Sequence, residues 1–253
     1  MATYTITPLK LGEFQQMDHS VQVHLVCPGD KRKAPITAFL IQGDGKTILV
    51  DTGPSDEAQA CKYHHPVVRT EEMQLKNALA AKGVAPEDID CVILTHLHWD
   101  HCYDLGLFPG KKIYVQRKEV EYAICPFPVH YVAYEAVQIG LDSPWIPYRG
   151  QFELVEGDKH LMDGIDLIFL PGHSPGFQGV MVDTTDGKYL VAGDFVHCYE
   201  NWEGRGIYKH IPAGTLMDLE TYYKSFDKVE GTFVHLLPGH DARTFEHGVY
   251  PAK

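Results

Sequence analysis

The sequence predicts one mixed α/β domain that spans residues 1–253. Short runs rich in β-branched and apolar residues recur along the chain, and segments with helical spacing separate them. No linker rich in Pro, Gly or Ser, charge block, low-complexity segment or internal repeat divides the chain. The hydrophobic share of 44% and the charged share of 22% are ordinary for a globular protein, and a chain of this length can bury a large core.

Strands and turns are expected to alternate in the first half of the chain. The runs at 21–26 and 35–42 are rich in β-branched and apolar residues, which predicts strands. Asp44-Gly45 predicts a hairpin turn into a strand at 46–50, because glycine tolerates the positive φ that tight hairpins require.

A helix is expected next, at 71–82. Thr70 can serve as its N-cap, and Glu71 and Glu72 suit the positive end of the helix dipole. Apolar residues keep helical spacing within this stretch, and Gly83 predicts its end.

The second half continues the pattern of strands, with one long irregular stretch. Strands are expected at 91–95, 113–116, 165–170, 178–183, 188–193 and 233–237, and a helix at 218–229. The stretch 124–150 is rich in aromatic residues and proline and has no regular period. Long irregular segments in compact domains are usually functional or disordered, and the aromatic content disfavours disorder. We therefore predict a lid or loop insertion around 124–150.

Residues of metal-binding type lie at the ends of four predicted strands. They are His96, His98, Asp100 and His101 after the first, His173 after the second, Asp194 after the third and His240 after the fourth. Loops held on a rigid scaffold commonly carry function, and such sites gather at the carboxyl ends of strands in α/β proteins.

The residue types indicate a site for two metal ions. Neutral imidazole and carboxylate suit zinc and neighbouring transition metals. Five histidines and two aspartates exceed what one ion can use, whereas two ions about 3.5–4 Å apart, sharing a carboxylate and a hydroxide, would use all of them. A lone pair of histidines would more often be a surface feature, and His173, Asp194 or His240 taken singly could equally be a turn or capping residue. Four such residues within six positions at a strand end are far harder to explain by chance.

The charge and the cysteines limit the partners and the compartment. A formal net charge of −12 disfavours nucleic acid and anionic membranes, so a small neutral or weakly polar substrate fits better. No apolar run approaches the roughly 20 residues that a membrane span requires, and the N-terminal stretch lacks the pattern of a secretory signal. The six cysteines are scattered and form no C-x-x-C pair, which favours a reducing compartment and predicts a cytoplasmic location.

The motif THLHWDH at 95–101, with the later PGHSPG, AGDF and PGHD, resembles the metallo-β-lactamase superfamily. The resemblance runs from ILVDTG at 48–53 to His240, and it implies an αββα sandwich with a dinuclear site along one edge of the two sheets. It places His96, His98 and His173 on a first metal, Asp100, His101 and His240 on a second, and Asp194 between them. It also implies that Asp51 supports the metal-site loop, although a strand-end turn residue is an equally good reading of Asp51.

Within this superfamily, the segment 100–123 is most similar to the N-acyl homoserine lactonase branch. His101 together with a bridging Asp194 argues against the β-lactamases, and glyoxalase II enzymes favour two glycines where this chain has Tyr103-Asp104. One position departs from the branch. Its members usually place a tyrosine three residues after the bridging aspartate, where it contacts the substrate carbonyl, and this chain has His197 there.

The resemblance implies a hydrolase that opens a lactone ring, with N-acyl homoserine lactones as one substrate class. A metal-bridging hydroxide would attack the ester carbonyl, His197 would polarise the carbonyl oxygen, and Asp100 would return the proton to the leaving oxygen. Zinc is the expected metal, and iron, manganese or cobalt could occupy the same ligands. Candidates for an apolar substrate wall are Tyr131, Tyr134, Trp145, Tyr148 and Trp202.

Other functions remain open at this point. The nearest alternatives are a thioesterase of the glyoxalase II type and a phosphotriesterase-like enzyme. An iron-dependent oxidoreductase of the persulfide dioxygenase type would leave part of the ligand cluster unused, and a binding module without enzymatic activity would not need so complete a set. A homodimer is compatible with the resemblance, although the sequence shows no interface.

Overall fold

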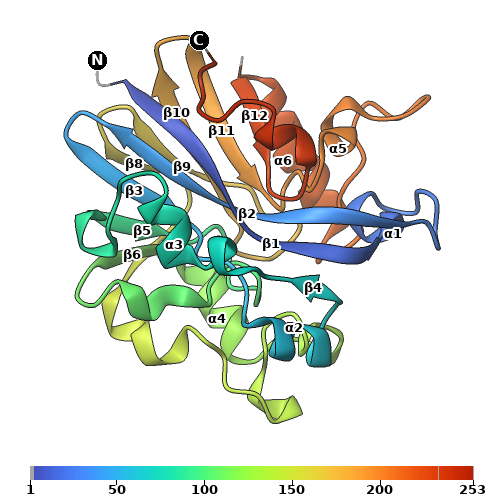
Figure 1. Cartoon of the computed structure of the whole chain (residues 1–253). Helices are drawn as coiled ribbons and strands as arrows, with labels where there is room; N and C mark the ends of the chain where they lie inside the picture. The colour runs from blue at the N-terminus through green and yellow to red at the C-terminus, as the bar shows by residue number, and fades with distance from the viewer. Residues whose placement is uncertain (1–2, 233, 253) are drawn as a thin grey trace.

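Two β-sheets packed face to face form the centre of the molecule, which we describe from a computed structural model covering residues 3–232 and 234–252 (Figure 1). In their order across the seven-stranded sheet, the strands are β4 (Val67–Val68), β1 (Tyr4–Asp18), β2 (Lys31–Gly43), β3 (Lys46–Val50), β5 (Cys91–Ile93), β6 (Lys112–Gln116) and β7 (Phe152–Val155). The five-stranded sheet has the order β12 (Val234–Pro238), β11 (Gly187–Gly193), β10 (Gln178–Thr184), β9 (Ile165–Phe169) and β8 (Lys159–Met162).

Helices cover the outer faces of both sheets. The α-helices are α1 (His19–Gln22), α2 (Glu57–Tyr63), α3 (Leu75–Ala80), α4 (Arg117–Ile124), α5 (Tyr199–Glu203) and α6 (Leu219–Glu230). Short 3-10 helices lie at Glu71–Met73, Pro86–Asp88, Asp104–Leu107, Pro128–His130, Val137–Ile139, Ile146–Gln151 and Ala242–Phe245. Leu79 of α3 belongs to the apolar cluster on one side of the large sheet, and Phe226 of α6 to the cluster on the outer side of the small sheet.

The alternation of side chains along the strands explains this layering. Successive residues of a strand point to opposite faces. In β2, Leu40 packs toward the helices of the large sheet, whereas its neighbour Ile41 lies in the cluster between the two sheets, with Val180 and Val191 of the small sheet. Both faces of the large sheet are therefore buried, and the predicted αββα sandwich is confirmed.

Most of the predicted elements are present. The strands expected at 35–42, 46–50, 91–95, 113–116, 165–170, 178–183 and 188–193 correspond to β2, β3, β5, β6, β9, β10 and β11, and the helix at 218–229 to α6. The strand at 233–237 corresponds to β12, apart from residue 233, which lies outside the described residues. The hairpin at Asp44-Gly45 is confirmed, since both residues have a positive φ, as its tight turn requires.

The strand predicted at 21–26 is wrong. Asp18 caps the short helix α1 there by accepting a hydrogen bond from the Ser20 backbone N–H, and irregular turns follow it. The chain pairs elsewhere, because the His24 backbone N–H donates to the Pro212 carbonyl. A long strand that the sequence analysis did not assign, β1, takes the place beside β2. Tertiary pairing overrode the local preference of this β-branched run.

The helix predicted at 71–82 is shorter and is interrupted. A 3-10 turn ends at Met73, Gln74 is extended, and α3 then runs from Leu75 to Ala80. Thr70 precedes the 3-10 turn but makes no capping hydrogen bond with its side chain. The interruption lets α3 start at a leucine that is fully buried in the core.

The stretch 124–150 contains three short 3-10 helices and is otherwise irregular. It is tied to the rest of the molecule, since the Trp99 backbone N–H donates to the Ala133 carbonyl over 2.9 Å. Its role as a lid stays a prediction. Among the residues that the structure describes, no helix is long and apolar enough to cross a membrane.

Candidate metal centre

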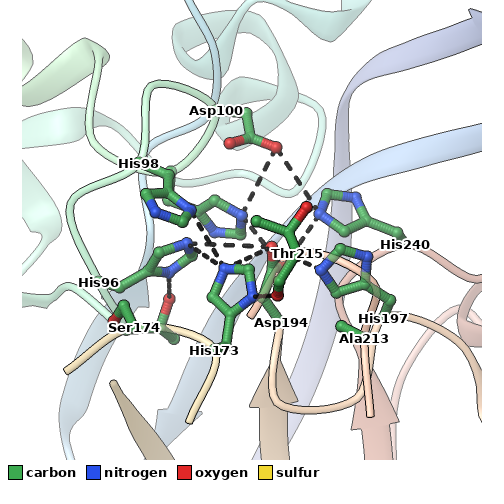
Figure 2. Close-up of polar contacts among 12 residues, drawn as sticks. His96, His98, Asp100, His173, Ser174, Asp194, His197, Ala213, Thr215 and His240 are labelled. Carbon is green, nitrogen blue, oxygen red and sulfur yellow. Dashed lines mark hydrogen bonds and ion pairs between the residues drawn. The ribbon is translucent and has the colours of Figure 1, made fainter. Parts of the chain in front are cut away.

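The strand ends that carry the predicted ligands meet at one edge of the sandwich. β9 and β11 both run antiparallel to β10, and β12 runs parallel to β11, so their carboxyl ends lie together. The loop that follows β5 approaches from the large sheet. The seven predicted ligands form one buried cluster, and Figure 2 shows Asp194 at its centre.

Four ligand atoms form a first set around one side of Asp194. His173 Nε2 lies 3.3 Å from His96 Nε2 and 3.1 Å from His98 Nδ1. The same nitrogen lies 3.4 Å from Asp194 Oδ2. Ligands about 2.1 Å from a tetrahedral zinc ion are separated by about 3.4 Å, so these atoms are spaced as one bound ion requires.

A second set surrounds the other oxygen of Asp194. Asp194 Oδ1 lies 3.2 Å from His101 Nε2 and 3.0 Å from His240 Nε2. Asp100 Oδ2 lies 3.7 Å from each of these two nitrogens. One carboxylate therefore turns its two oxygens to two separate groups of ligands, which is the arrangement of a bridging residue.

Unsatisfied polar atoms indicate that the cluster is built to hold cations. His101 Nε2 and Asp194 Oδ1 are buried and have no hydrogen-bond partner among the described residues. Burying such atoms without a partner costs about 1–3 kcal/mol each. Lone pairs of buried imidazole and carboxylate groups, left without hydrogen bonds and aimed at common points, fit two divalent cations.

Contacts behind the histidines fix which nitrogen faces the centre. His101 Nδ1 lies 2.8 Å from Asp51 Oδ2. His173 Nδ1 donates to the Thr215 carbonyl over 2.7 Å (Figure 2), and His240 Nδ1 to that of Pro35 over 2.8 Å. A proton held at Nδ1 leaves Nε2 as the free lone pair, so these partners select the tautomer that can bind a metal.

Asp51 acts as an anchor behind the motif. Its carboxylate also accepts hydrogen bonds of 2.8 Å from the Thr95 backbone N–H and from Thr95 Oγ1, so it ties the start of the loop to His101. Its φ is +63°, a left-handed conformation that few residues other than glycine adopt. Asp51 is thus both the strand-end turn residue and the support that the sequence analysis considered.

Burial and charge set the protonation of the cluster. Burial, reinforced by the neighbouring histidines, lowers the pKa of His96 and of His98 well below the usual value, which keeps these imidazoles neutral. Burial opposes the charge of Asp194, but the nearby His240, His101 and His197 hold the pKa of its carboxyl well below the usual range. His96, His98 and Asp194 are therefore in the protonation state that binds cations.

His197 also lies in this cluster. Its ring is buried between the rings of His173 and His240, and its Nε2 lies 3.1 Å from Asp194 Oδ2. Neither ring nitrogen has a hydrogen-bond partner among the described residues. The nearby Tyr199 packs against Arg243 and not against the cluster. The guanidinium carbon of Arg243 lies 4.1 Å from the centre of the Tyr199 ring.

The predicted substrate wall is only partly brought to the cluster. Tyr134 packs its ring edge-on against His98, with 4.6 Å between the ring centres. Trp145 is buried in the core and stacks on Phe152, and Trp202 stacks on His210, so the structure gives both tryptophans packing roles. Large apolar rings fill cores as often as pockets, and the sequence alone did not distinguish the two. Tyr131 and Tyr148 are half-buried, and their role stays a prediction.

Truncating Trp145 tests this packing role. Trp145→Ala is expected to lower the free energy of unfolding by roughly 3–5 kcal/mol, because it empties a packed site. Trp145→Phe is expected to cost less, and the KM for substrate should stay unchanged in both variants. Denaturant unfolding and steady-state kinetics check this. A KM that rises tenfold in a stable Trp145→Phe protein would restore Trp145 to the substrate wall.

Sequence reasoning missed two buried residues that support the site. The His64 ring stacks on Trp99 at 3.9 Å, and its Nε2 lies 2.8 Å from Glu135 Oε1. Glu119, in the first turn of α4, has no exposed surface and accepts four hydrogen bonds. In the sequence, an acidic residue near a helix N-terminus is explained by its favourable interaction with the helix dipole, so Glu119 gave no sign of a further role. The usable signal was its position four residues before Ala123, on the face of α4 that is buried.

Comparisons with known proteins agree with this geometry. The profile of the metallo-beta-lactamase superfamily matches residues 32–242. An N-acyl homoserine lactonase of Bacillus thuringiensis is 32% identical over 197 residues, covering 74% of each chain. The N-acyl homoserine lactonase AttM of Azorhizobium caulinodans is 28% identical over 247 residues, covering 92% of this chain and 91% of the relative.

Solved structures extend the likeness to nearly the whole chain. An N-acyl homoserine lactone hydrolase with the product N-hexanoyl-L-homoserine bound at its catalytic metal centre superposes with a TM-score of 0.77. It is 26% identical, and the match covers 96% of this chain and 95% of that one. From its fold, its ligand cluster and these relatives, we conclude that the chain belongs to the metallo-β-lactamase superfamily and resembles its N-acyl homoserine lactonase branch.

Proposed function

We propose that this protein is a dinuclear metal-dependent lactonase whose substrates are N-acyl homoserine lactones. The observation that carries the proposal is the position of Asp194, whose two oxygens face two separate groups of ligands. The superfamily hosts several reactions on such a site, and the names of the relatives favour the lactone over the thioester or phosphotriester.

The geometry supports a division of the ligands between two metals. We assign His96, His98 and His173 to the first metal, Asp100, His101 and His240 to the second, and Asp194 to both. Nitrogen and carboxylate ligands at near-tetrahedral spacing favour zinc, and iron, manganese or cobalt could use the same atoms.

When bound, the two ions would act as Lewis acids, which lowers the pKa of a water toward about 7 and polarises an ester carbonyl. Ring opening adds water across the bond between the carbonyl carbon and the ring oxygen, so the ring oxygen must gain a proton as that bond breaks. Asp100 borders the cluster and keeps a small exposed surface, which suits it to deliver that proton. His197 has a ring nitrogen without a partner and can donate a hydrogen bond to the carbonyl oxygen.

A substrate panel tests the proposal. Purified protein is analysed for its metal content, and acid release is followed by pH-stat with an N-acyl homoserine lactone, a simple γ-lactone, a thioester and a phosphotriester. We expect about two metals per chain, and a ring-opened acyl homoserine product by mass spectrometry. Thioester or phosphotriester turnover without lactone turnover would replace the lactonase with another hydrolase. A single iron with oxygen consumption would overturn the hydrolase.

Replacing His197 tests its proposed role. His197→Ala is expected to lower kcat by about 10²–10³-fold, as the loss of one donor to a developing oxyanion does in other enzymes. The metal content should stay at two per chain, and His197→Tyr should recover part of the rate because a phenol can donate the same hydrogen bond. Elemental analysis beside kinetics distinguishes the alternatives, since loss of metal from His197→Ala would make His197 a ligand.

The proposals on compartment and assembly rest on the sequence. All six cysteines are free, as expected for a reducing compartment such as the cytoplasm. A homodimer stays a prediction.

A further inference from the structure

Glu119 of α4 makes four hydrogen bonds from a fully buried position. Its Oε1 accepts from the Leu97 backbone N–H at 3.1 Å and from the Tyr134 hydroxyl at 2.9 Å. Its Oε2 accepts from Ser174 Oγ at 2.6 Å and from the Gly176 backbone N–H at 3.0 Å. A carboxylate has about four acceptor sites, so this group is saturated and holds three separate segments together.

These donors sit beside the three histidines of the first ligand set. Leu97 lies between His96 and His98 in the chain, and Ser174 directly follows His173. Tyr134 packs against the ring of His98. Each histidine of this set is therefore next in the chain to a residue that donates to Glu119, and His98 also contacts the ring of a third donor, Tyr134.

The second ligand set has other supports. His101 is held by Asp51 and His240 by the Pro35 carbonyl, and none of the hydrogen bonds of Glu119 reaches the residues that flank His240. Asp51 reaches the first set only indirectly, through Thr95, whose Oγ1 lies 3.0 Å from His96 Nδ1. The direct carboxylate partner of each set is therefore different.

Close packing keeps the carboxylate in place. A Cβ atom added at Gly176 would lie 2.1 Å from the Glu119 backbone nitrogen, so the loop after His173 packs directly on the start of α4. The carboxylate then has little freedom to follow a displaced loop.

We propose that Glu119 is a positioning residue for the first metal and sets the affinity of the His96, His98 and His173 group separately from that of the second group. The proposal rests on the proposed two-metal site. It extends the site beyond its ligands to one carboxylate that joins two ligand-bearing loops and the segment 124–150.

Glu119→Gln tests this at nearly constant volume. The amide replaces one carboxylate oxygen, which accepted two hydrogen bonds, with an NH₂ group that can only donate. The two protein donors on that side would therefore lose their acceptor. Glu121, on the exposed side of the same helix, provides the matched control Glu121→Gln. Tyr134→Phe removes a single one of the four hydrogen bonds and serves as a milder second variant if Glu119→Gln folds poorly.

Zinc binding at buffered free concentrations is the readout, with circular dichroism to check folding. We expect Glu119→Gln to bind the first metal about 10–100-fold more weakly, as changes behind metal ligands commonly do, with the second metal little affected. Tyr134→Phe should give a smaller shift in the same direction, and Glu121→Gln none. In the form of Glu119→Gln that holds one metal, X-ray absorption should count two imidazole ligands on that metal, as expected for the His101 and His240 group. A higher concentration of free zinc should restore the other metal.

Three results would overturn the proposal. Unchanged affinities in both variants would leave Glu119 without influence on the metals, and equal weakening of both metals with a lower Tm would make its role a general structural one. A one-metal form with three imidazole ligands would reverse the assignment. These readouts need no lactone turnover, so a wild-type protein that binds two metals but opens no lactone would refute the proposed function and leave this inference standing.

Discussion

Asp194→Ala is expected to remove both metal ions together and to abolish most lactone hydrolysis. The two oxygens of Asp194 face different ligand groups, so its loss takes one ligand from each ion. Metal ions supply several kcal/mol of transition-state stabilisation, so kcat/KM should fall on the order of 10³-fold or more. Elemental analysis and lactone kinetics on the same preparation measure both effects.

Asp100→Ala is the comparison for this variant. Asp100 faces only the His101 and His240 group, so its replacement should weaken the second metal and leave the first in place. An Asp194→Ala protein that keeps two metals and the full rate would show that Asp194 does not bridge.

Removing the metals with a chelator is expected to abolish activity and to destabilise the fold. An ion held at a free concentration 1,000 times its Kd stabilises the native state by about 4 kcal/mol. For a chain of this size, that corresponds to roughly 8–16 °C in Tm for each ion. Differential scanning calorimetry before and after chelation, with zinc added back as the control, measures the change. A Tm that does not move would mean that the cluster is equally stable without cations.

Rebinding should be tighter at higher pH. In the metal-free protein, burial opposes the charge on His240, but Asp194 outweighs it and raises the pKa of His240 above the usual value. His101 behaves in the same way, with Asp194 and Asp100 as the main partners that raise its pKa. Protons therefore compete for these two ligand nitrogens below the raised pKa values, and affinity should increase as the pH rises through them. Zinc titrations at pH 6 and pH 8 test the direction.

The sequence by itself determined where the residues of metal-binding type lie, at the ends of predicted strands. His96, His98, Asp100 and His101 follow one strand directly, so their place at its end depended only on local pattern. Runs of β-branched residues and turns that contain glycine are also local patterns. They predicted β2, β3 and the hairpin between them, and all three are present. Where a residue's role follows from its neighbours in the chain, pattern was sufficient.

Only the tertiary structure decided which partner each of these residues has. The sequence could not show that the two oxygens of Asp194 face different groups. It also could not show that Glu119 accepts a hydrogen bond from Gly176, which lies 57 positions further along the chain. It also could not separate Trp145, packed in the core, from an aromatic wall of a pocket. The run at 21–26 formed no strand because hydrogen-bond partners distant in the chain decided its path. These outcomes depend on burial and long-range pairing, which local propensity does not encode.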